Sequence, residues 1–355
     1  MGIYYVARHK YHVDAMYPIW EGTGGEWIFV HREVHGYKGL EHSKKKFSDL
    51  TEKDLVIANC PLPEASSAKY KFVRLELMQH SPGQRTNMRE RKCGMIDYGI
   101  VTTDSNWDLD YDLSPTYKRM RDEGRIFQAG AWFKKYYLDR MESKSDGNTI
   151  LLAPASSNTA GGFLNVVGEQ IIEKLLSEGY KVILMPHELD VYNLPGRGVI
   201  ERLRERMANG ELEGLELLDS KNTGIDKIEY AFTKSDICIS DFSGTSYEFA
   251  YLNKPVIHLK NTSKDRWNPK YKHGNYHHTV GPLVDFEKCN FLPTVQFAMT
   301  APEEFIQVSN EEWDRLEALH DTVGLREVDP ITPSIKIILD CYDRLQQGNL
   351  PKKDY

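Results

Sequence analysis

The sequence has no run of 18 apolar residues, so no segment of it reads as a membrane-spanning helix. Its first ten residues also lack a basic stretch followed by an apolar core, and we expect no secretory signal. The five cysteines are scattered without a Cys-x-x-Cys pair, which argues against a disulfide framework and against a zinc site of that type.

Positive charge is also scarce, because the formal net charge is −7, and this argues against a dedicated nucleic-acid-binding protein. Hydrophobic residues make up 40% and charged residues 27%, which is the balance of a globular protein. We therefore expect a cytoplasmic protein that does not bind nucleic acid. Local basic runs such as 44–46 leave peripheral contact with the inner face of the cell membrane open.

Short β-prone stretches alternate with helical patterns along the chain, as in an α/β protein. Strands are predicted at 3–6, 27–30, 54–59, 72–79, 97–102, 125–130, 149–153, 181–185, 215–218, 237–239 and 254–259. Helices are predicted at 13–21, 165–177, 199–208, 226–233, 247–251, 311–319 and 335–347, with Pro18 interrupting the first. The polar, turn-rich segment 142–148 separates two such series, so we predict two Rossmann-like domains that face a central cleft.

The most informative stretch, residues 235–250, reads as a buried strand, a tight polar turn and a helix. Asp241 stands where the strand ends, Ser243, Gly244 and Thr245 belong to the small, polar turn before the helix, and we place all four at a candidate phosphate site. The first amides of a helix have no partner within it, and together with the helix dipole they favour a phosphate group. An ordinary capped helix would have the same local sequence, so both interpretations stay open here.

Two histidines follow apolar strands at equivalent points of the two halves. His80 comes after 75–79 and precedes a Pro-Gly loop, and His187 follows 182–185 and Pro186. A neutral imidazole suits a general base near neutral pH, and it can also donate to a phosphate oxygen. Each alone also fits a loop histidine, but the paired placement favours a functional role.

The strand 149–153 runs into a small, polar loop that contains Pro154 and Ser156 and ends in a Gly-Gly pair. This loop can line a nucleotide site, although it matches neither a Walker A motif nor Gly-x-Gly-x-x-Gly. The remaining histidine groups, 9 with 12 and 273 with 277 and 278, lack the companions of a metal site, and we predict no required metal.

In this order the motifs resemble those of the CDP-glycerol glycerophosphotransferase family, which has the two-domain architecture of B-type glycosyltransferases. Its Trp-His-Gly-Thr-Pro loop is similar to 79–83, its Ala-Pro-Thr strand end to 151–155, and its Arg-Pro-His-Pro strand end to 184–188. The most specific matches are a Thr-Asp-Tyr-Ser-Ser-x-x-x-Asp motif, similar to 240–248, and a Lys-Pro-Ile-Ile strand, similar to 254–257.

The resemblance covers about residues 70–285 and implies a reaction. Glycerol-phosphate, or a related polyol-phosphate, would move from a CDP-activated donor to a hydroxyl of a glycan or lipid-linked acceptor, with release of CMP and no cofactor. His80 would deprotonate the acceptor, and Glu248 would contact the glycerol or sugar part of the donor. The donor pyrophosphate would be held by His187, Ser243, Gly244 and Thr245.

The resemblance also implies a division of labour. Residues 1–145 would form an acceptor domain, residues 146–310 a nucleotide-donor domain, and residues 311–355 helices that pack back toward the N-terminal domain. The sequence departs from the family at Gln79, Ser81 and Gly244, and its Arg-Asn-Asp segment is missing. Two alternatives therefore stay open, a nucleotide-sugar glycosyltransferase of the same fold and a catalytically degenerate protein that binds a nucleotide or phosphopolyol.

Overall fold

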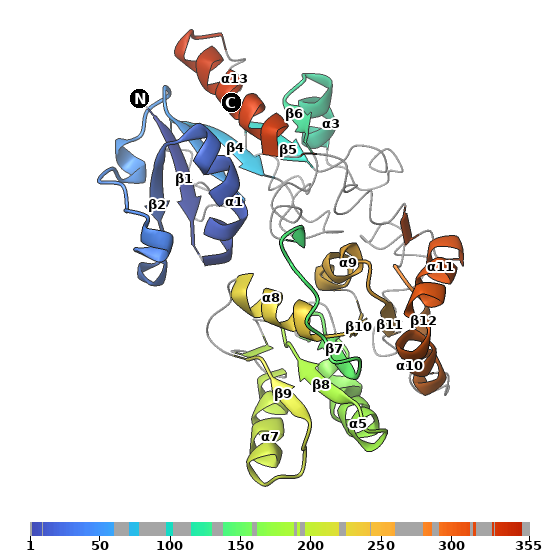
Figure 1. The fold of residues 1–355 in the computed structure, drawn as a ribbon. Helices are drawn as coiled ribbons and strands as arrows, with labels where there is room; N and C mark the ends of the chain where they lie inside the picture. Colours follow the sequence, from blue (N-terminus) through green and yellow to red (C-terminus); the bar gives the residue numbers. More distant parts are fainter. Residues whose placement is uncertain are drawn as a thin grey trace. The chain divides into compact units, whose positions relative to one another are not determined.

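The computed structural model describes residues 2–8, 10–59, 71–77, 97–101, 115–129, 138–157, 162–187, 190–191, 196–219, 225–241, 243–259, 280–285, 291–312, 315–316, 329 and 331–349. The chain divides into two compact units, Met1–Tyr137 with Asp321–Tyr355 and Leu138–His320. Each unit contains one six-stranded sheet in which all paired strands are parallel, flanked by helices (Figure 1). The predicted α/β class with two Rossmann-like domains is confirmed.

The sheet of the first unit has the strand order β2-β1-β3-β4-β5-β6. Its strands are β1 (Ile3–Ala7), β2 (Glu26–Phe29), β3 (Leu55–Ala58), β4 (Val73–Leu77), β5 (Tyr98–Val101) and β6 (Ile126–Gln128). The described helices are α1 (Lys10–Thr23), α3 (Pro115–Asp122) and α13 (Ile331–Gln346), with the short 3-10 helices η1 (Arg32–Val34), η2 (Tyr37–Gly39) and η3 (Phe47–Asp49).

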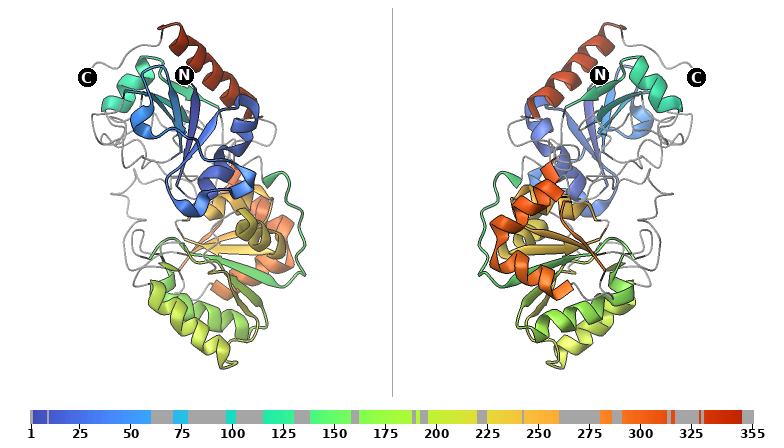
Figure 2. Two further views of the ribbon diagram at one scale, coloured as in Figure 1. Left: turned by 90° about the vertical axis from the view of Figure 1, so that its left-hand side faces the viewer. Right: turned by 90° about the vertical axis from the view of Figure 1, so that its right-hand side faces the viewer.

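Helices α1 and α13 come from opposite ends of the chain and pack against each other on one face of this sheet (Figure 2). Alternate strand residues such as Tyr5 and Ile57 meet Met16 of α1 and Ile338 of α13 in one apolar core. The intervening strand residues, such as Val56, face a smaller cluster on the other side. Burial on both faces explains why the central strands β1 and β3 are continuous apolar runs.

Helix α1 runs through Pro18, although a proline removes one backbone donor and usually kinks or ends a helix. Met16 and Ile19 on either side of it are fully buried in the core. Packing of this apolar face therefore outweighs the local cost of the proline, which the sequence pattern alone does not reveal.

The sheet of the second unit has the strand order β12-β11-β10-β7-β8-β9. Its strands are β7 (Thr149–Ala153), β8 (Lys181–Leu184), β9 (Leu215–Leu217), β10 (Ile237–Ser240), β11 (Val256–Leu259) and β12 (Leu283–Val284). The described helices are α5 (Leu164–Ser177), α7 (Gly196–Ala208), α8 (Ile225–Lys234), α9 (Gly244–Tyr251), α10 (Phe291–Thr300) and α11 (Pro302–Glu312).

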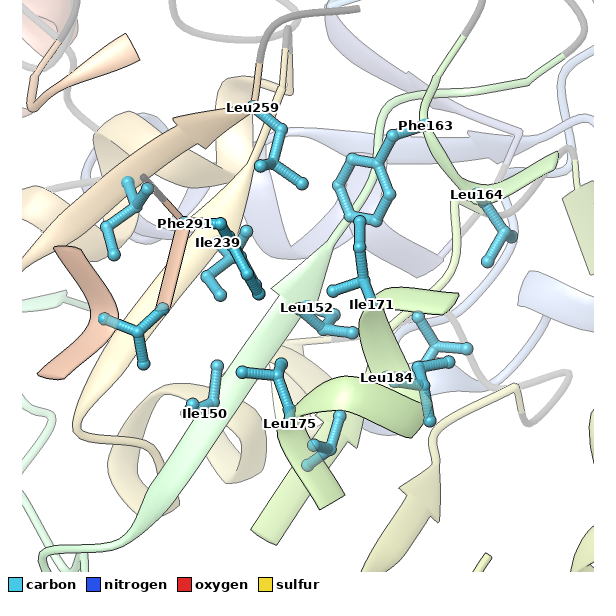
Figure 3. Close-up of a cluster of buried hydrophobic side chains, with 14 of the residues drawn as sticks. Ile150, Leu152, Phe163, Leu164, Ile171, Leu175, Leu184, Ile239, Leu259 and Phe291 are labelled. Atoms are coloured by element: carbon cyan, nitrogen blue, oxygen red, sulfur yellow. The ribbon is translucent and has the colours of Figure 1, made fainter. Parts of the chain in front are cut away.

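The core of the second unit lies between one face of this sheet and helices α5, α7 and α10. Figure 3 shows Ile150 and Leu152 of β7 and Ile239 of β10 among side chains from α5 and α10. Helices α8 and α9 contact β7, β10 and β11, and contribute none of the described residues of this core. They pack together on the opposite face through Phe232 and Phe249, whose rings meet edge to face at 5.3 Å.

Strands β7 and β10 are neighbours at the centre of this sheet, yet the chain leaves them in opposite directions. After β7 it builds β8 and β9 on one side, and after β10 it builds β11 and β12 on the other. The segments that follow the two strands therefore lead to opposite sides of the sheet, which makes the β7/β10 pair a topological switch point. In open α/β sheets this switch point is the usual place for a ligand.

Candidate functional site

The candidate site is the carboxyl edge of the second sheet, at β10, β7 and β8. These three strands are direct neighbours, with Ser240 opposite Ala153 and Leu152 opposite Leu184. The sequence-predicted residues of the second unit follow their ends. Parallel strands bring these loops to one edge although the chain separates them widely.

The start of α9 supplies the groups best suited to an anion. Ser243 is the N-cap, and its hydroxyl oxygen accepts a hydrogen bond from the amide of Thr245 at 3.3 Å. The proton of that hydroxyl stays free to donate. The amide of Gly244 has no hydrogen-bond partner among the described residues. An amide, two hydroxyls and the positive end of the helix dipole thus converge within one turn.

Asp241, which follows β10 directly, is fully buried, and its carboxylate binds backbone rather than solvent. One oxygen accepts from the amide of Ala155 at 2.7 Å, and the other accepts from the amide of Phe163 at 2.8 Å. Asp241 therefore ties the end of β10 to the loop after β7 and to the start of α5. In this geometry the carboxylate positions the loops and is not itself exposed to a phosphate.

The loop after β7, which contains Pro154 and Ser156, is held through its amides. Besides the two bonds to Asp241, the amide of Gly162 donates to the Ser156 carbonyl at 3.2 Å. A Cβ on Gly162 would lie 1.9 Å from the carbonyl oxygen of Ala155, so only glycine allows this approach. The amides of Ala155, Gly162 and Phe163 are thus already bonded within the protein and do not face a phosphate.

His258 in β11 fixes the same region from the other side, and its ring is 1% exposed. Its Nε2 accepts from the amide of Val280 at 3.2 Å, so Nδ1 carries the proton and donates to the Asp241 carbonyl at 3.1 Å. Burial lowers the pKa of His258 from 6.5 to about 4, and the nearby Arg315 charge adds to this. The ring is therefore neutral at physiological pH.

His187 follows β8 after Met185 and Pro186, and its side chain is exposed at the edge of the sheet. Partial desolvation of the ring, together with the positive charge of Lys227, holds the pKa of His187 below its ordinary value of 6.5. An imidazole in this state is neutral at pH 7. It can donate one N–H to a phosphate oxygen and gains basicity once an anion is bound.

Glu248 lies in α9 one turn beyond Thr245 and is buried, at 4% exposed. Residues three apart on a helix share a face, so Glu248 lies behind the hydroxyl of Thr245. The far end of α9 is anchored by the buried guanidinium of Arg315, which donates to the carbonyls of Ala250 and Lys254 at 2.7 and 2.9 Å. The helix that presents Gly244 is thus fixed at both ends.

The Lys-Pro strand, the second of the specific sequence matches, has a structural role here. The ammonium of Lys254 donates to the carbonyls of Phe232 and Ser235 at 2.7 and 2.6 Å, which closes the C-terminus of α8. Burial lowers the pKa of Lys254 to about 8. Its place at the amino end of β11 puts it at the opposite edge of the sheet from Ser243.

His80, the main candidate of the first unit, lies outside the described residues, as do Gln79 and Ser81. β4 ends at Leu77, three residues before His80, and that part of the prediction stays a prediction.

Some residues that build this edge escaped the sequence analysis. Asp190 and His258 were not singled out, because a polar residue after or within an apolar strand has no obvious partner in one dimension. A signal existed for Asp190, which stands three residues after His187. Gly162 was noted only as part of the Gly-Gly pair that ends a small, polar loop, whereas the structure requires it for a close approach.

Within the described ranges, no group of three or more histidine, cysteine, aspartate or glutamate side chains is arranged to hold a metal ion. The same residues include no helix that is both long and apolar enough to cross a membrane.

Solved structures of other proteins share this fold. The wall teichoic acid polymerase TagF matches with a TM-score of 0.58 and 15% identity, over 98% of this chain and 89% of that one. UDP-GlcNAc 2-epimerase from Neisseria meningitidis, bound to UDP-GlcNAc, matches with a TM-score of 0.56 and 15% identity, over 96% and 100%. MnaA from S. aureus, solved with UDP, matches with a TM-score of 0.58 and 13% identity, over 99% and 98%.

The fold is that of the B-type glycosyltransferases. Transferases and epimerases match it about equally well, and at these identities the likeness shows architecture alone. No family model matches the sequence, and no curated protein matches it either.

Proposed function

We propose that this protein is a transferase that moves glycerol-phosphate, or a related polyol-phosphate, from a CDP-activated donor to a hydroxyl of a glycan or lipid-linked acceptor. One observation carries the proposal: the capped start of α9, with the Ser243 and Thr245 hydroxyls and the Gly244 amide, lies at the β7/β10 switch point. Under this proposal, residues 146–310 would bind the donor and residues 1–145 would bind the acceptor. Residues 311–355 would support the acceptor domain.

The donor pyrophosphate would lie over the start of α9. The Gly244 amide and the two hydroxyls would donate to its oxygens, and His187 would donate from the end of β8. Fixed donors of this kind stabilise charge that builds up on a phosphoryl group without needing to reorganise during the reaction. Glu248 would contact the glycerol through a hydroxyl, and Pro154 and Ser156 would border the nucleoside.

The transfer step makes one bond and breaks one. The acceptor oxygen would attack the phosphorus that carries glycerol, while the bond from that phosphorus to the bridging oxygen breaks and CMP leaves. The proton of the acceptor hydroxyl would go to His80, the predicted general base. Positioning and charge stabilisation would supply the acceleration, with no cofactor or required metal.

Two specific features support a CDP-polyol over other donors. The stretches 240–248 and 254–257 resemble the corresponding motifs of the glycerophosphotransferases, and both flank the candidate site. TagF, whose fold this chain shares, has been solved after soaking with the compound abbreviated CDPG. Peripheral contact with the membrane that carries a lipid-linked acceptor belongs to the same proposal.

A second candidate is an enzyme that acts on a UDP-sugar, either a glycosyltransferase or an epimerase. It is favoured by the fold likeness to proteins solved with UDP-GlcNAc and UDP. A third is a protein that binds such a ligand without turnover, which is favoured by the departures from the family pattern at Gln79 and Ser81.

Calorimetry on the purified protein without added metal separates these candidates. We expect CDP-glycerol or CDP-ribitol to bind more tightly than UDP-GlcNAc, and CMP rather than CDP to be released during transfer. Preference for UDP-GlcNAc would replace the proposal with the second candidate. CDP-glycerol binding without CMP release in the presence of acceptor glycans would support the third.

Two variants test the residues. The double variant Ser243→Ala/Thr245→Ala is expected to weaken CDP-glycerol binding, whereas His80→Ala is expected to abolish CMP release with nearly unchanged binding. A matched control, Ser177→Ala/Thr300→Ala, removes two hydroxyls that bond helix carbonyls at the ends of α5 and α10. Full transfer by His80→Ala would exclude the proposed base.

A further inference from the structure

Asp190 is a buried carboxylate that the proposed mechanism does not use. It is 0% exposed, and both of its oxygens accept from the amide of Ser157 at 3.0 Å. Its own amide donates to the carbonyl of His187 at 2.8 Å. One residue therefore joins the loop after β7 to the end of β8.

The side chain of Asp190 is also confined by α7. A Cβ on Gly196, the first residue of that helix, would lie 2.4 Å from the Cβ of Asp190 and 2.7 Å from its Oδ1. Atoms cannot approach that closely, so the glycine is what allows α7 to begin against the carboxylate. Glutamate, one methylene longer, would not fit in the same space.

Ser157 has an unused polar group at the same place. Its side chain is 5% exposed, and its hydroxyl oxygen has no hydrogen-bond partner in the part of the chain that the structure describes. A buried hydroxyl without a partner is costly, and native proteins usually supply one from protein, water or ligand. Its amide is held by Asp190, so the orientation of this residue depends on that carboxylate.

We propose that Asp190 is a positioning residue of the nucleotide site, which holds the Ser157 hydroxyl and the His187 ring in register so that both can bond oxygens of one bound nucleotide diphosphate. This inference rests on the proposed nucleotide-binding function and adds to it a contact, Ser157, and the residue that places it. Asp190 itself touches no ligand.

The geometry of the adjacent strands supports one shared ligand. β7 and β8 are paired up to Leu152 opposite Leu184, and the amide of Met185 donates to the Leu152 carbonyl at 2.9 Å. Beyond these residues the strand pairing ends, and Asp190 provides the next connection between the two segments. Because the described strand pairing stops short of the loop and of His187, the Asp190 bonds are what set their separation among the described residues.

The test compares Asp190→Asn with a control at the other edge of the same sheet. Asp236 precedes β10, and its carboxylate accepts from the amide of Thr149 at 2.9 Å, so Asp236→Asn makes the same chemical change at the amino ends of the strands. We expect Asp190→Asn to weaken CDP binding about tenfold in calorimetry, since small misplacements of binding groups have large effects. Asp236→Asn should change CDP affinity less than about twofold, because Asp236 lies at the other edge of the sheet and shares no partner with Asp190.

Two further variants separate positioning from contact. Gly196→Ala displaces Asp190 without altering its charge, and we expect a smaller loss of CDP affinity in the same direction. Ser157→Ala keeps the backbone bond to Asp190 and removes only the hydroxyl, so it should weaken CDP binding without loosening the loop. Unchanged CDP binding in Ser157→Ala would overturn the contact, and equal losses in Asp190→Asn and Asp236→Asn would overturn the positioning role.

Hydrogen exchange gives a readout that needs no nucleotide. Asp190→Asn is expected to speed exchange in peptides covering both 154–157 and 184–187, whereas Asp236→Asn leaves the second peptide unchanged. If the wild-type protein bound neither CDP nor UDP, the proposed function would fail while this coupling could still be observed. Normal exchange at 184–187 in Asp190→Asn would overturn the coupling itself.

Discussion

Carboxylates bond backbone amides at both edges of the second sheet, but they differ in how deeply they are buried. At the carboxyl edge, Asp241 and His258 bond backbone groups from full burial. At the amino edge, Asp236 accepts from Thr149 while only half-buried, and exposed Asp146 pairs with Lys181. Asp236 and Asp146 therefore tie strand ends of the amino edge without being fully buried.

The difference indicates what the carboxyl edge is built for. Burying a carboxylate costs free energy unless it is fully hydrogen-bonded, so such groups are retained where a fixed geometry is needed. The loops they fix, after β7 and β10, are those that flank the switch point. We infer that the buried groups hold a binding surface in shape, whereas those of the amino edge only close the sheet.

The largest effect that tests this comparison is expected from Asp241→Ala. Two buried amides, those of Ala155 and Phe163, would lose their acceptor, and each such loss costs about 1–3 kcal/mol. We expect the free energy of unfolding to fall by about 4 kcal/mol in urea titrations followed by circular dichroism.

The control for this variant is Asp236→Ala at the amino edge. It removes one bond from a half-buried site where water can replace the carboxylate, so we expect a loss of only about 1 kcal/mol. Equal losses for the two variants would mean that the edges do not differ in the way proposed.

The second effect is a dependence of stability on pH. His258 has a pKa of about 4 in the folded protein and 6.5 as its ordinary value, so the unfolded chain binds more protons between these values. The free energy of unfolding should therefore fall as pH drops from 6.5 to 4, by roughly 3 kcal/mol from this group.

His258→Gln isolates that contribution, because the variant has no titrating group at this position. It should be less stable than the wild type at pH 7, yet lose less stability between pH 6.5 and 4. Urea titrations at pH 7, 5.5 and 4.5 check this. Parallel curves for the two proteins would show that protonation of His258 is not coupled to unfolding.

Gly162 and Gly168 provide the third test, since they lie near each other in sequence but meet different neighbours. Gly162→Ala would force a Cβ against the Ala155 backbone oxygen, and we expect a loss of about 2 kcal/mol together with weaker nucleotide binding. Gly168→Ala in α5 meets only the flexible end of Leu164 at 3.0 Å and gains helix propensity.

Stability measurements on both alanine variants therefore separate crowding from the general effect of replacing glycine. We expect Gly168→Ala to change the free energy of unfolding by less than about 1 kcal/mol. A comparable loss in the two variants would show that the close approach at Gly162 is not what fixes the loop.

The sequence predicted most strands of both sheets, because a buried parallel strand is a short apolar run between turn residues. β7, for example, spans the predicted 149–153. The capped start of α9 was also visible, although the helix begins at Gly244 rather than at the predicted 247. Both features depend on neighbouring residues in the sequence, so they can be recognised without knowledge of the fold.

Features that depend on distant residues were not predictable. Asp241 bonds amides that lie 86 and 78 positions away, so its role follows only once β10 pairs with β7. Helix α10 (Phe291–Thr300) lacks a clear polar face and was missed, as was α11 (Pro302–Glu312) up to 310, while most of the predicted helix 311–319 lies outside the described residues. In these segments burial against the sheet, rather than periodicity, decides the structure.

The smallest effect is expected at the exposed ion pair of the amino edge, between Lys181 and Asp146. This pair, with the hydroxyl of Thr149, lowers the pKa of Asp146 to about 2, so its contribution is present above pH 3.8 and is lost as pH falls through about 2. Exposed pairs contribute little, and Lys181→Met should cost less than about 1 kcal/mol.

Salt then distinguishes the two edges directly. In 1 M NaCl the Debye length is about 3 Å, so the cost of Lys181→Met should fall toward zero. The cost of Asp241→Ala should stay the same, because its carboxylate is buried and bonds neutral amides that mobile ions cannot reach. Urea titrations of both variants at low and high salt check this, and a loss at Asp241 that salt reduces equally would mean that the carboxyl edge opens to solvent in the folded protein.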